Sequence, residues 1–126
     1  MQRQLAYQQY RQTQIQTATA DNLILMLYQG AIKFAKQALI ALENSEIEEC
    51  HNKLLRVQDI LDELSNSLNL QAGDIAIGLQ NIYEYMNYRL VQANITKDPK
   101  QITEVIEMLN ELFETWSVVV SNMKGR

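Results

Sequence analysis

The chain has 126 residues, 47% of them apolar, and a formal net charge of −4 at pH 7. This length fits one domain that buries a core without disulfides or structural metals. The acidic balance leaves no basic surface for phosphates, which argues against nucleic acid and anionic membranes as partners. The single cysteine cannot form an internal disulfide. Because we find neither a signal-peptide-like start nor an apolar stretch of membrane-spanning length, we expect a cytoplasmic protein without stable membrane insertion.

Turn-forming residues are scarce, since the chain has four glycines and one proline among many Leu, Ile, Ala, Gln and Glu residues. This composition predicts an all-α fold. The first helix is expected to begin near Thr19 and to end between Leu42 and Asn44. Its apolar residues recur at spacings of three and four in two adjacent rows, so its apolar face is wide enough to need several neighbours.

Three further helix starts are predicted from capping residues. Ser45 followed by Glu48 forms a capping box for the second helix, and Asp74 can cap the third. Asp98 and Pro99 occupy the N-cap and first helical positions of the fourth. The residues expected to face inward are Ile47, Cys50, Leu54, Val57, Leu61, Leu64 and Leu68 on the second helix, Ile75, Leu79, Ile82, Met86, Leu90 and Ala93 on the third, and Ile102, Ile106, Leu109, Phe113, Trp116, Val120 and Met123 on the fourth. Four helices with short connections predict an antiparallel four-helix bundle over residues 17–126.

Residues 1–16 form a separate N-terminal segment that holds seven glutamines, two arginines and no acid. We expect it to be mobile or only conditionally docked. Its apolar side chains include Tyr7, Tyr10 and Ile15. A short helical turn would place both tyrosine rings on one side, where they could cap an apolar groove and be displaced from it. A frayed terminus is the competing interpretation.

Catalytic and metal-binding patterns are weak. Glu48 and His51 have the E-x-x-H spacing of di-metal bundles, but with one histidine in the chain the second motif cannot exist. Cys50 lies on an apolar seam, which favours a small buried side chain over a nucleophile. The glutamates of the fourth helix, such as Glu104 and Glu107, are interpreted as a solvated face. We therefore expect no metal, no cofactor and no enzymatic activity. A small enzyme that uses Glu48, Cys50 and His51 stays open as an alternative.

Apolar and aromatic side chains exceed what the bundle seams require. The surplus suggests an outer groove that binds an amphipathic helix of another protein. A core that uses more positions per heptad is the competing interpretation. The residues predicted to line such a groove are Leu55, Ile60, Ile77, Tyr83, Val105, Met108, Leu112 and Val119. A helical, self-associating adaptor or scaffold protein remains the alternative function.

Three stretches, in order along the chain, resemble the flagellar secretion chaperones of the FliS family. The first has Tyr10, Ile15 and the step Thr17, Ala18, Thr19, followed by LILMLYQGAIKF at 23–34. The second is GDIAIGLQNIYEYMNYRL at 73–90, followed by Ala93 and Asn94. The third is the step Glu114, Thr115, Trp116. Ala20 and Asn22 depart from the family's proline and its acid or Gln, which bears on the strength of the helix cap.

The resemblance implies a four-helix bundle in the bacterial cytosol that holds the C-terminal segment of flagellin along its outer grooves and catalyses nothing. It implies that this binding prevents premature polymerisation of flagellin, that the N-terminal segment rearranges on binding, and that the loaded complex visits the flagellar export gate. From the sequence we expect the unloaded chain to be a monomer or to self-associate weakly.

Overall fold

The computed structural model describes residues 20–124, with the side chains of residues 21–122. Its long helices are α2 (Ala20–Glu43), α3 (Ile47–Asn66), α4 (Asp74–Thr96) and α5 (Pro99–Lys124), and a short 3₁₀ turn, η1 (Leu70–Ala72), precedes α4. At 1.5 Å per residue these helices are about 30–39 Å long, so each can pack along the others. No β-strand occurs between residues 20 and 124. The prediction of an all-α four-helix bundle is confirmed.

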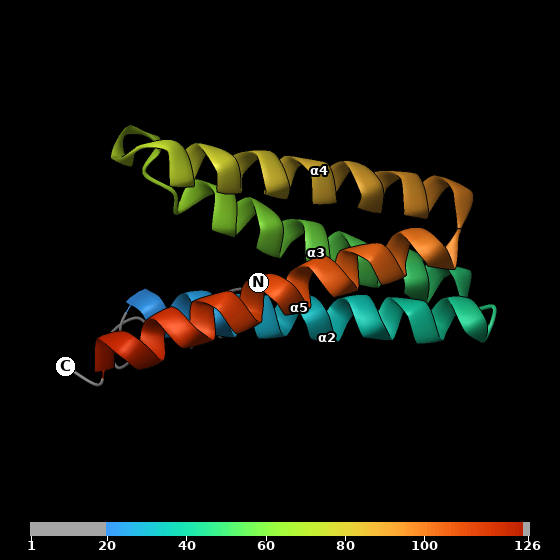
Figure 1. The fold of residues 1–126 in the computed structure, drawn as a ribbon. Coiled ribbons are helices and arrows are strands. Elements are labelled where there is room, and N and C mark those ends of the chain that lie inside the picture. The colour runs from blue at the N-terminus through green and yellow to red at the C-terminus, as the bar shows by residue number, and fades with distance from the viewer. Residues whose placement is uncertain (1–19, 125–126) are drawn as a thin grey trace, which may run out of the picture.

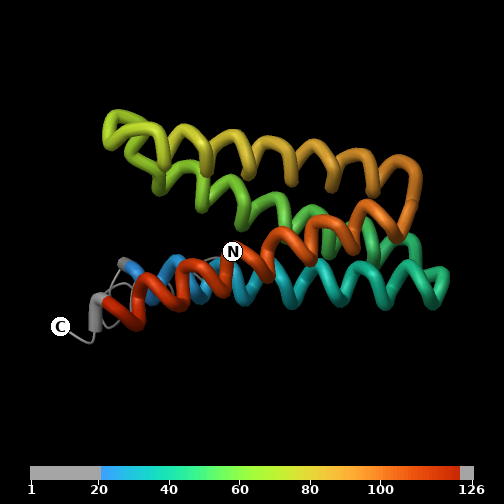
Figure 2. Tube along the Cα trace, in the orientation of Figure 1, coloured from blue at the N-terminus to red at the C-terminus, as the bar shows by residue number. Residues whose placement is uncertain are grey.

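Each long helix packs against two of the others. α2 packs against α3 and α5, and α4 packs against the same two helices. In Figure 1, α3 and α4 lie together above α2 and α5, and consecutive helices run in opposite directions. The trace in Figure 2 shows the short connections at alternating ends. The bundle therefore has two opposite outer faces, one formed by α3 and α4 and the other by α2 and α5.

Small side chains bring α2 close to its neighbours. Four alanines of α2 that recur at spacings of three and four, Ala31, Ala35, Ala38 and Ala41, are buried where this helix meets the bundle. Large side chains of the other helices fill the space that the alanines leave, as close packing of a protein interior requires. They include Leu54, Val57, Leu61, Leu64, Met86, Leu90, Ile102, Val105 and Leu109.

The turn between α2 and α3 differs from the predicted capping box. Ser45 has a φ of 59°, and α3 begins two residues later, after Glu46, without a side-chain cap. The Ser45 N–H donates to Leu42 O over 3.1 Å, and the Glu46 N–H donates to Ala41 O over 2.8 Å. This pair of bonds is the Schellman motif, which ends a helix with a left-handed residue. Ser45 therefore ends α2 and does not begin α3.

The start of α4 also corrects the prediction. Gly73, with a φ of 122° that suits glycine, precedes the helix, and no side-chain cap is made there. Ile75 is 83% exposed, so its assignment to the core is wrong. At α5 the prediction is confirmed, because Asp98 Oδ1 accepts from the Lys100 N–H over 2.9 Å. Thr19, the predicted cap of the first helix, lies outside the described residues.

One helix in the described part of the chain, Asp21–Glu43, is long and apolar enough to cross a membrane by length and composition. The expectation that no stretch reaches this length is therefore wrong. The same residues supply the buried side of α2, with Tyr28, Ala31 and Ala35 in the bundle core. A core helix of a bundle meets this criterion because neighbouring helices cover its apolar face.

Candidate functional site

An apolar groove of about 700 Å³ runs between α3 and α4 on the outer surface. Ile47 and Leu55 of α3 face Val91 and Ile95 of α4 across it. Each of these four side chains is between 42% and 75% exposed. A contiguous exposed apolar surface of this kind is typical of a protein-binding site.

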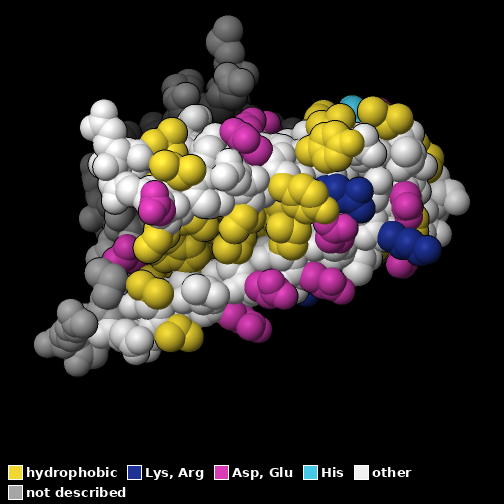
Figure 3. Space-filling view, turned by 45° about the horizontal axis from the view of Figure 1, so that its top comes forward, with side chains coloured by type: hydrophobic (Ala, Val, Ile, Leu, Met, Phe, Trp, Pro, Cys, Tyr) yellow, Lys and Arg dark blue, Asp and Glu magenta, His cyan; other side chains and the backbone are white. Residues whose placement is uncertain are grey.

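The groove exists because α4 is apolar on two sides. Tyr83, Met86, Leu90 and Ala93 recur at spacings of three and four and face the core. Val91 is turned by about 100° from Leu90 and Ile95 by about 200° from Ala93, so both lie away from the core side of the helix. Since α3 covers only one flank of α4, the second apolar row stays at the surface. In Figure 3, one cluster of exposed apolar side chains lies beside the histidine at the top of the molecule.

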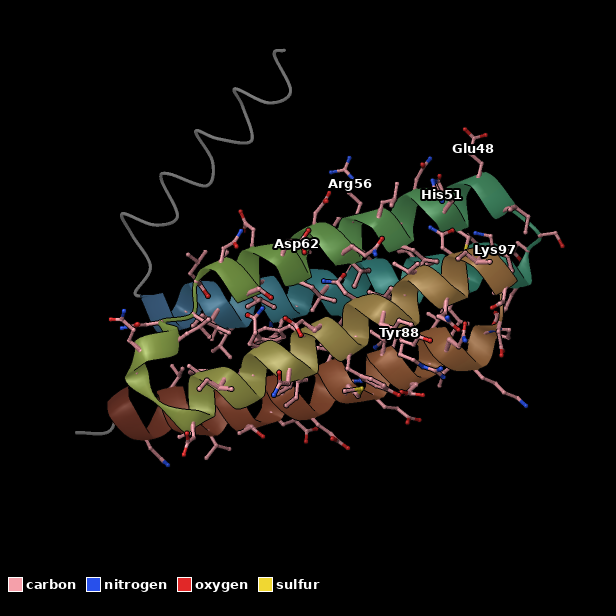
Figure 4. The ribbon with its side chains drawn as sticks, turned by 90° about the horizontal axis from the view of Figure 1, so that it is seen from above. Glu48, His51, Arg56, Asp62, Tyr88 and Lys97 are labelled. Atoms are coloured by element: carbon pink, nitrogen blue, oxygen red, sulfur yellow. The ribbon has the colours of Figure 1, made fainter. Side chains whose placement is uncertain are left out.

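Charged and polar side chains mark both ends of the groove. Glu48 and His51 of α3 and Lys97 at the end of α4 lie at one end, as Figure 4 shows. The Lys97 ammonium hydrogen-bonds Asn94 Oδ1. Towards the other end, Asn87 Nδ2 donates to Asp62 Oδ1 over 3.3 Å and links α4 to α3. The lining residues of α3 run from Ile47 to Gln58. This span is about 16 Å, which matches three turns of a bound helix.

The structure does not assemble the alternative enzyme site. Glu48 and His51 line the groove, but Cys50 is fully buried in the core behind it. Burial raises the pKa of the Cys50 thiol, and the charge of Lys97 only partly opposes this. A thiol in such surroundings stays protonated and unreactive. Among the described residues, no group of three or more His, Cys, Asp or Glu side chains is placed to hold a metal ion.

The residues predicted to line a groove are distributed over several surfaces. Leu55 lies in the α3/α4 groove. Ile60 lines a separate hollow with Phe34 between α3 and α2. Met108 and Leu112 line a smaller hollow of about 180 Å³ with Ile82, between α5 and α4. Ile77 and Val119 are exposed on α4 and α5.

Two of the predicted groove residues belong to the core. Tyr83 is 2% exposed and Val105 is fully buried. Both were assigned to a groove because they lie beside the expected seam, but each helix here contacts two neighbours and so buries a wider stripe than one seam. A partner on the outer surface cannot reach them in this fold, and their assignment is wrong.

The predicted groove set also lacked three residues that line the observed groove. Ile47 was assigned to the core seam of its helix, although the structure leaves it exposed. Ile95 lies in the last turn of α4, which continues to Thr96. Val91 is not among the predicted groove residues, although it is 45% exposed. The row of Tyr88, Val91 and Ile95 at spacings of three and four is the signal that could have identified this side of α4.

The surface between α4 and α5 carries a polar network that the sequence interpretation missed. Glu104, interpreted as a solvated acid, accepts from the Tyr85 hydroxyl and forms an ion pair with Arg89 at 3.0 Å. This network ties the middle of α4 to the first half of α5. Figure 3 shows apolar side chains along the boundary between these helices, with acidic side chains on α5 beside them. The N-terminal residues Tyr7, Tyr10 and Ile15 lie outside the described residues.

Comparisons with known proteins agree with this architecture. The family model described as "Flagellar protein FliS" matches residues 2–123. The flagellar secretion chaperone FliS of Bacillus subtilis (strain 168) is 34% identical over 116 residues, which cover 92% of this chain and 86% of the relative. That of Campylobacter jejuni is 34% identical over 97% of this chain and 96% of its own.

A solved structure described as a flagellar chaperone from bacteria has the same fold. Its TM-score is 0.78 at 20% sequence identity, with 94% of this chain and 98% of that chain covered. The family model and the relatives span nearly the whole sequence, including the helices that form the groove. The chain belongs to the FliS family of flagellar secretion chaperones.

Proposed function

We propose that this chain is a cytoplasmic export chaperone that binds the C-terminal segment of flagellin as an amphipathic helix in the α3/α4 groove. The observation that carries the proposal is the exposed apolar lining of one continuous groove by Ile47, Leu55, Val91 and Ile95. Membership of a family of flagellar secretion chaperones supports it. The bound segment would then be handed to the flagellar export gate.

The groove chemistry suits this role. Complete burial of an aliphatic side chain contributes about 1.5–3 kcal/mol, and the four lining residues are about half exposed, so their burial gives roughly 3–6 kcal/mol in total. This gain offsets much of the free energy that ordering a partner helix costs. Flagellin's terminal helices associate through their apolar faces, so a chaperone that covers such a face prevents polymerisation in the cytosol. Glu48 and Lys97 at one end provide charges that fix the direction of the bound helix.

The test is titration calorimetry of the purified protein with a peptide covering the C-terminal segment of flagellin from the same cell. We expect a one-to-one complex with a negative heat-capacity change, because apolar surface is buried. Ile95→Asp should weaken binding by about 2 kcal/mol or more, since it places a charge in the apolar groove. Far-UV circular dichroism should show unchanged helicity, because Ile95 is 75% exposed.

Ile75→Asp is the matched control, since Ile75 is an exposed isoleucine of the same helix and does not line the groove. It should bind like the unmodified chain. If both variants bind with unchanged affinity, the α3/α4 groove is not the site. If the unmodified chain gives neither heat nor a change in size with the peptide, flagellin is not the partner.

We also propose that residues 1–16 act as a cap, with Tyr7, Tyr10 and Ile15 as its apolar contacts. Their composition supports this role, because a segment with two arginines and no acid is attracted to an acidic domain. Deletion of the segment should leave the bundle stable and change the affinity for flagellin. Tighter binding would identify a competing plug, and weaker binding a clamp over the partner. Equal affinity would refute both forms.

A further inference from the structure

A second apolar groove lies between α4 and α5, on the other flank of α4 from the α3/α4 groove. Half-buried Ile82 of α4 and Met108 and Leu112 of α5 line its hollow of about 180 Å³. Val119, which is 42% exposed, continues the row of α5 two turns beyond Leu112. The apolar stripe that these four residues form follows the boundary of the two helices over about three turns of α5 (Figure 3).

One end of the α4/α5 groove is closed and the other is open. At the closed end the Tyr85 hydroxyl donates to Glu104, and Arg89 pairs with the same carboxylate at 3.0 Å. Towards the start of α4, a β-carbon placed at Gly78 would have nothing within 4 Å. In Figure 1, α4 and α5 converge at their connection and separate towards the start of α4. No helix of the described part of the chain covers the apolar side chains at the open end.

The helices around this groove are acidic and lack basic residues over most of their length. Between Asp74 and Tyr88 of α4, and between Gln101 and Met123 of α5, the sequence has six acids and no Lys, Arg or His. The acids are Asp74, Glu84, Glu104, Glu107, Glu111 and Glu114. Those at 107, 111 and 114 are exposed and form a row on α5 at spacings of four and three. This acidic row runs beside the apolar stripe, since the acids at 107 and 111 each precede one of its residues.

The acidic row has no cation beside it among residues 20–124. The ion pair at this groove joins Arg89 to Glu104, and within the described residues Glu107, Glu111 and Glu114 take part in no other. Like charges three and four residues apart on a helix repel one another. A ligand that places positive charges along the row removes this repulsion, so the surface is complementary to a basic ligand.

We propose that the α4/α5 groove binds an amphipathic helix of a second protein that carries Lys or Arg along one flank of its apolar face. The helix lies along α5, with its apolar residues on Met108, Leu112 and Val119. Its basic residues then lie beside Glu107 and Glu111. An amphipathic helix of about three turns fills the length of the stripe, with apolar anchors at spacings of three and four.

The charges favour this occupant over other helices. An acidic helix would be repelled by the row on α5, and an uncharged helix would desolvate its carboxylates without pairing them. The α3/α4 groove differs, because Glu48 and Lys97 give it both signs of charge. The two grooves of α4 therefore select helices of different charge. Since they lie on opposite flanks of α4, both can be occupied at the same time.

The test is fluorescence anisotropy of a labelled helical peptide of about 18 residues, with Leu at spacings of three and four and Lys at the flanking positions. The full chain is titrated into it. A peptide with Glu at every Lys position is the control ligand. We expect the basic peptide to bind one-to-one, more weakly as salt is added, and the acidic peptide not to bind. Glu107→Lys with Glu111→Lys should weaken binding about tenfold or more, because two attractive contacts become repulsive.

Two sets of control variants separate this groove from general attraction to an acidic protein. Glu43→Lys with Asp59→Lys makes the same change in net charge with exposed acids of α2 and α3, and should bind the basic peptide like the unmodified chain. Val119→Asn should weaken binding about fivefold, because it removes an apolar contact of the stripe. Val118→Asn should have no effect, since Val118 is exposed and is turned by about 100° from Val119. Far-UV circular dichroism checks that each variant keeps its helices.

Several results would overturn the proposal. One is equal affinity of the basic peptide for the Glu107→Lys, Glu111→Lys variant and its control. Another is loss of binding in Ile95→Asp, which should bind the basic peptide normally, because such a loss would place the peptide in the α3/α4 groove. Displacement of the bound peptide by the flagellin segment, or by a peptide of residues 1–16, would assign the α4/α5 groove to that segment instead.

Discussion

Ser45 adopts a backbone conformation that glycine usually provides. Its φ of 59° lies in the left-handed region, and its side chain is exposed. For a residue with a β-carbon this region costs about 1–2 kcal/mol. The turn tolerates that cost because the two Schellman bonds from Ser45 and Glu46 satisfy carbonyl groups at the end of α2.

Replacement of Ser45 by glycine should therefore stabilise the bundle. We expect the free energy of unfolding to rise by about 0.5–1 kcal/mol, because the relief of strain exceeds the entropy that glycine adds to the unfolded chain. Urea denaturation followed by circular dichroism measures the change. Asn44→Gly is the control, since Asn44 does not have a positive φ. It should leave stability unchanged or lower it, and an equal gain from both variants would contradict the role of strain.

Ser45 and Asp98 also show how far capping signals can be trusted. Both residues precede helices and carry side chains that cap helices well. At Asp98 the next residue is Pro99, which suits the first helical position and is poorly tolerated further inside a helix, so the cap forms as predicted. At Ser45 no proline fixes the start of α3. The same residue could end one helix or begin the next, and the short connection favoured the end of α2.

The pairing of α2 with α4 depends on polar atoms in the core. These helices lie on the diagonal of the bundle and meet through the hydroxyls of Tyr28 and Tyr83, which are 2.5 Å apart. Both rings are almost completely buried. Each hydroxyl can donate and accept, so this pair satisfies both buried oxygens across the core.

Removal of one hydroxyl from this pair leaves the other one buried without a partner. The losses of the two single variants should therefore add up to more than the loss of the double variant. Tyr28→Phe leaves the buried Tyr83 hydroxyl without its partner, so we expect a loss of about 1–3 kcal/mol in the free energy of unfolding. Tyr83→Phe should cost a similar amount, because it leaves the buried Tyr28 hydroxyl without its partner. The double variant should cost about 1 kcal/mol less than the sum of the single changes. Denaturant titrations of the four proteins measure this coupling.

Tyr88→Phe provides the comparison for that cycle. Tyr88 is also on α4 but is exposed, and its hydroxyl accepts from the Gln92 side chain of its own helix. Combined with Tyr28→Phe, it should give an additive loss. Additive losses for Tyr28 and Tyr83 as well would show that the two hydroxyls do not depend on each other.

The bundle as a whole could be read from the sequence because its periodicity is strong in every helix. Spacings of three and four fixed the helices and most of the core, with Leu54, Leu61, Met86 and Leu109 buried as predicted. The groove could not be read as well, because apolar patterning alone does not say which of two apolar rows a neighbour covers. Val105 and Ile95 illustrate this limit, since the first is buried between helices and the second is exposed where α4 has no neighbour.

The buried tyrosine pair makes the stability of the whole molecule depend on pH in the alkaline range. Burial raises the pKa of Tyr28 and of Tyr83 above the ordinary value, and the bond to Tyr83 raises that of Tyr28 further. In the unfolded chain both groups titrate near pH 10. Because the pKa is higher in the native state, unfolding releases protons once the pH exceeds the unfolded value of about 10. Stability contributed by the neutral pair is therefore complete below about pH 10 and is lost as the pH rises further.

We expect the free energy of unfolding to fall by about 1.4 kcal/mol per pH unit for each of these tyrosines above roughly pH 10. Phenolate absorbance should show exposed tyrosines titrating first, and Tyr28 and Tyr83 only when the bundle unfolds. The double variant Tyr28→Phe with Tyr83→Phe lacks both groups, so its stability should decline less steeply over the same range. Equal slopes for the variant and the unmodified chain would assign the alkaline loss to other groups, because the neutral pair would then contribute nothing to it.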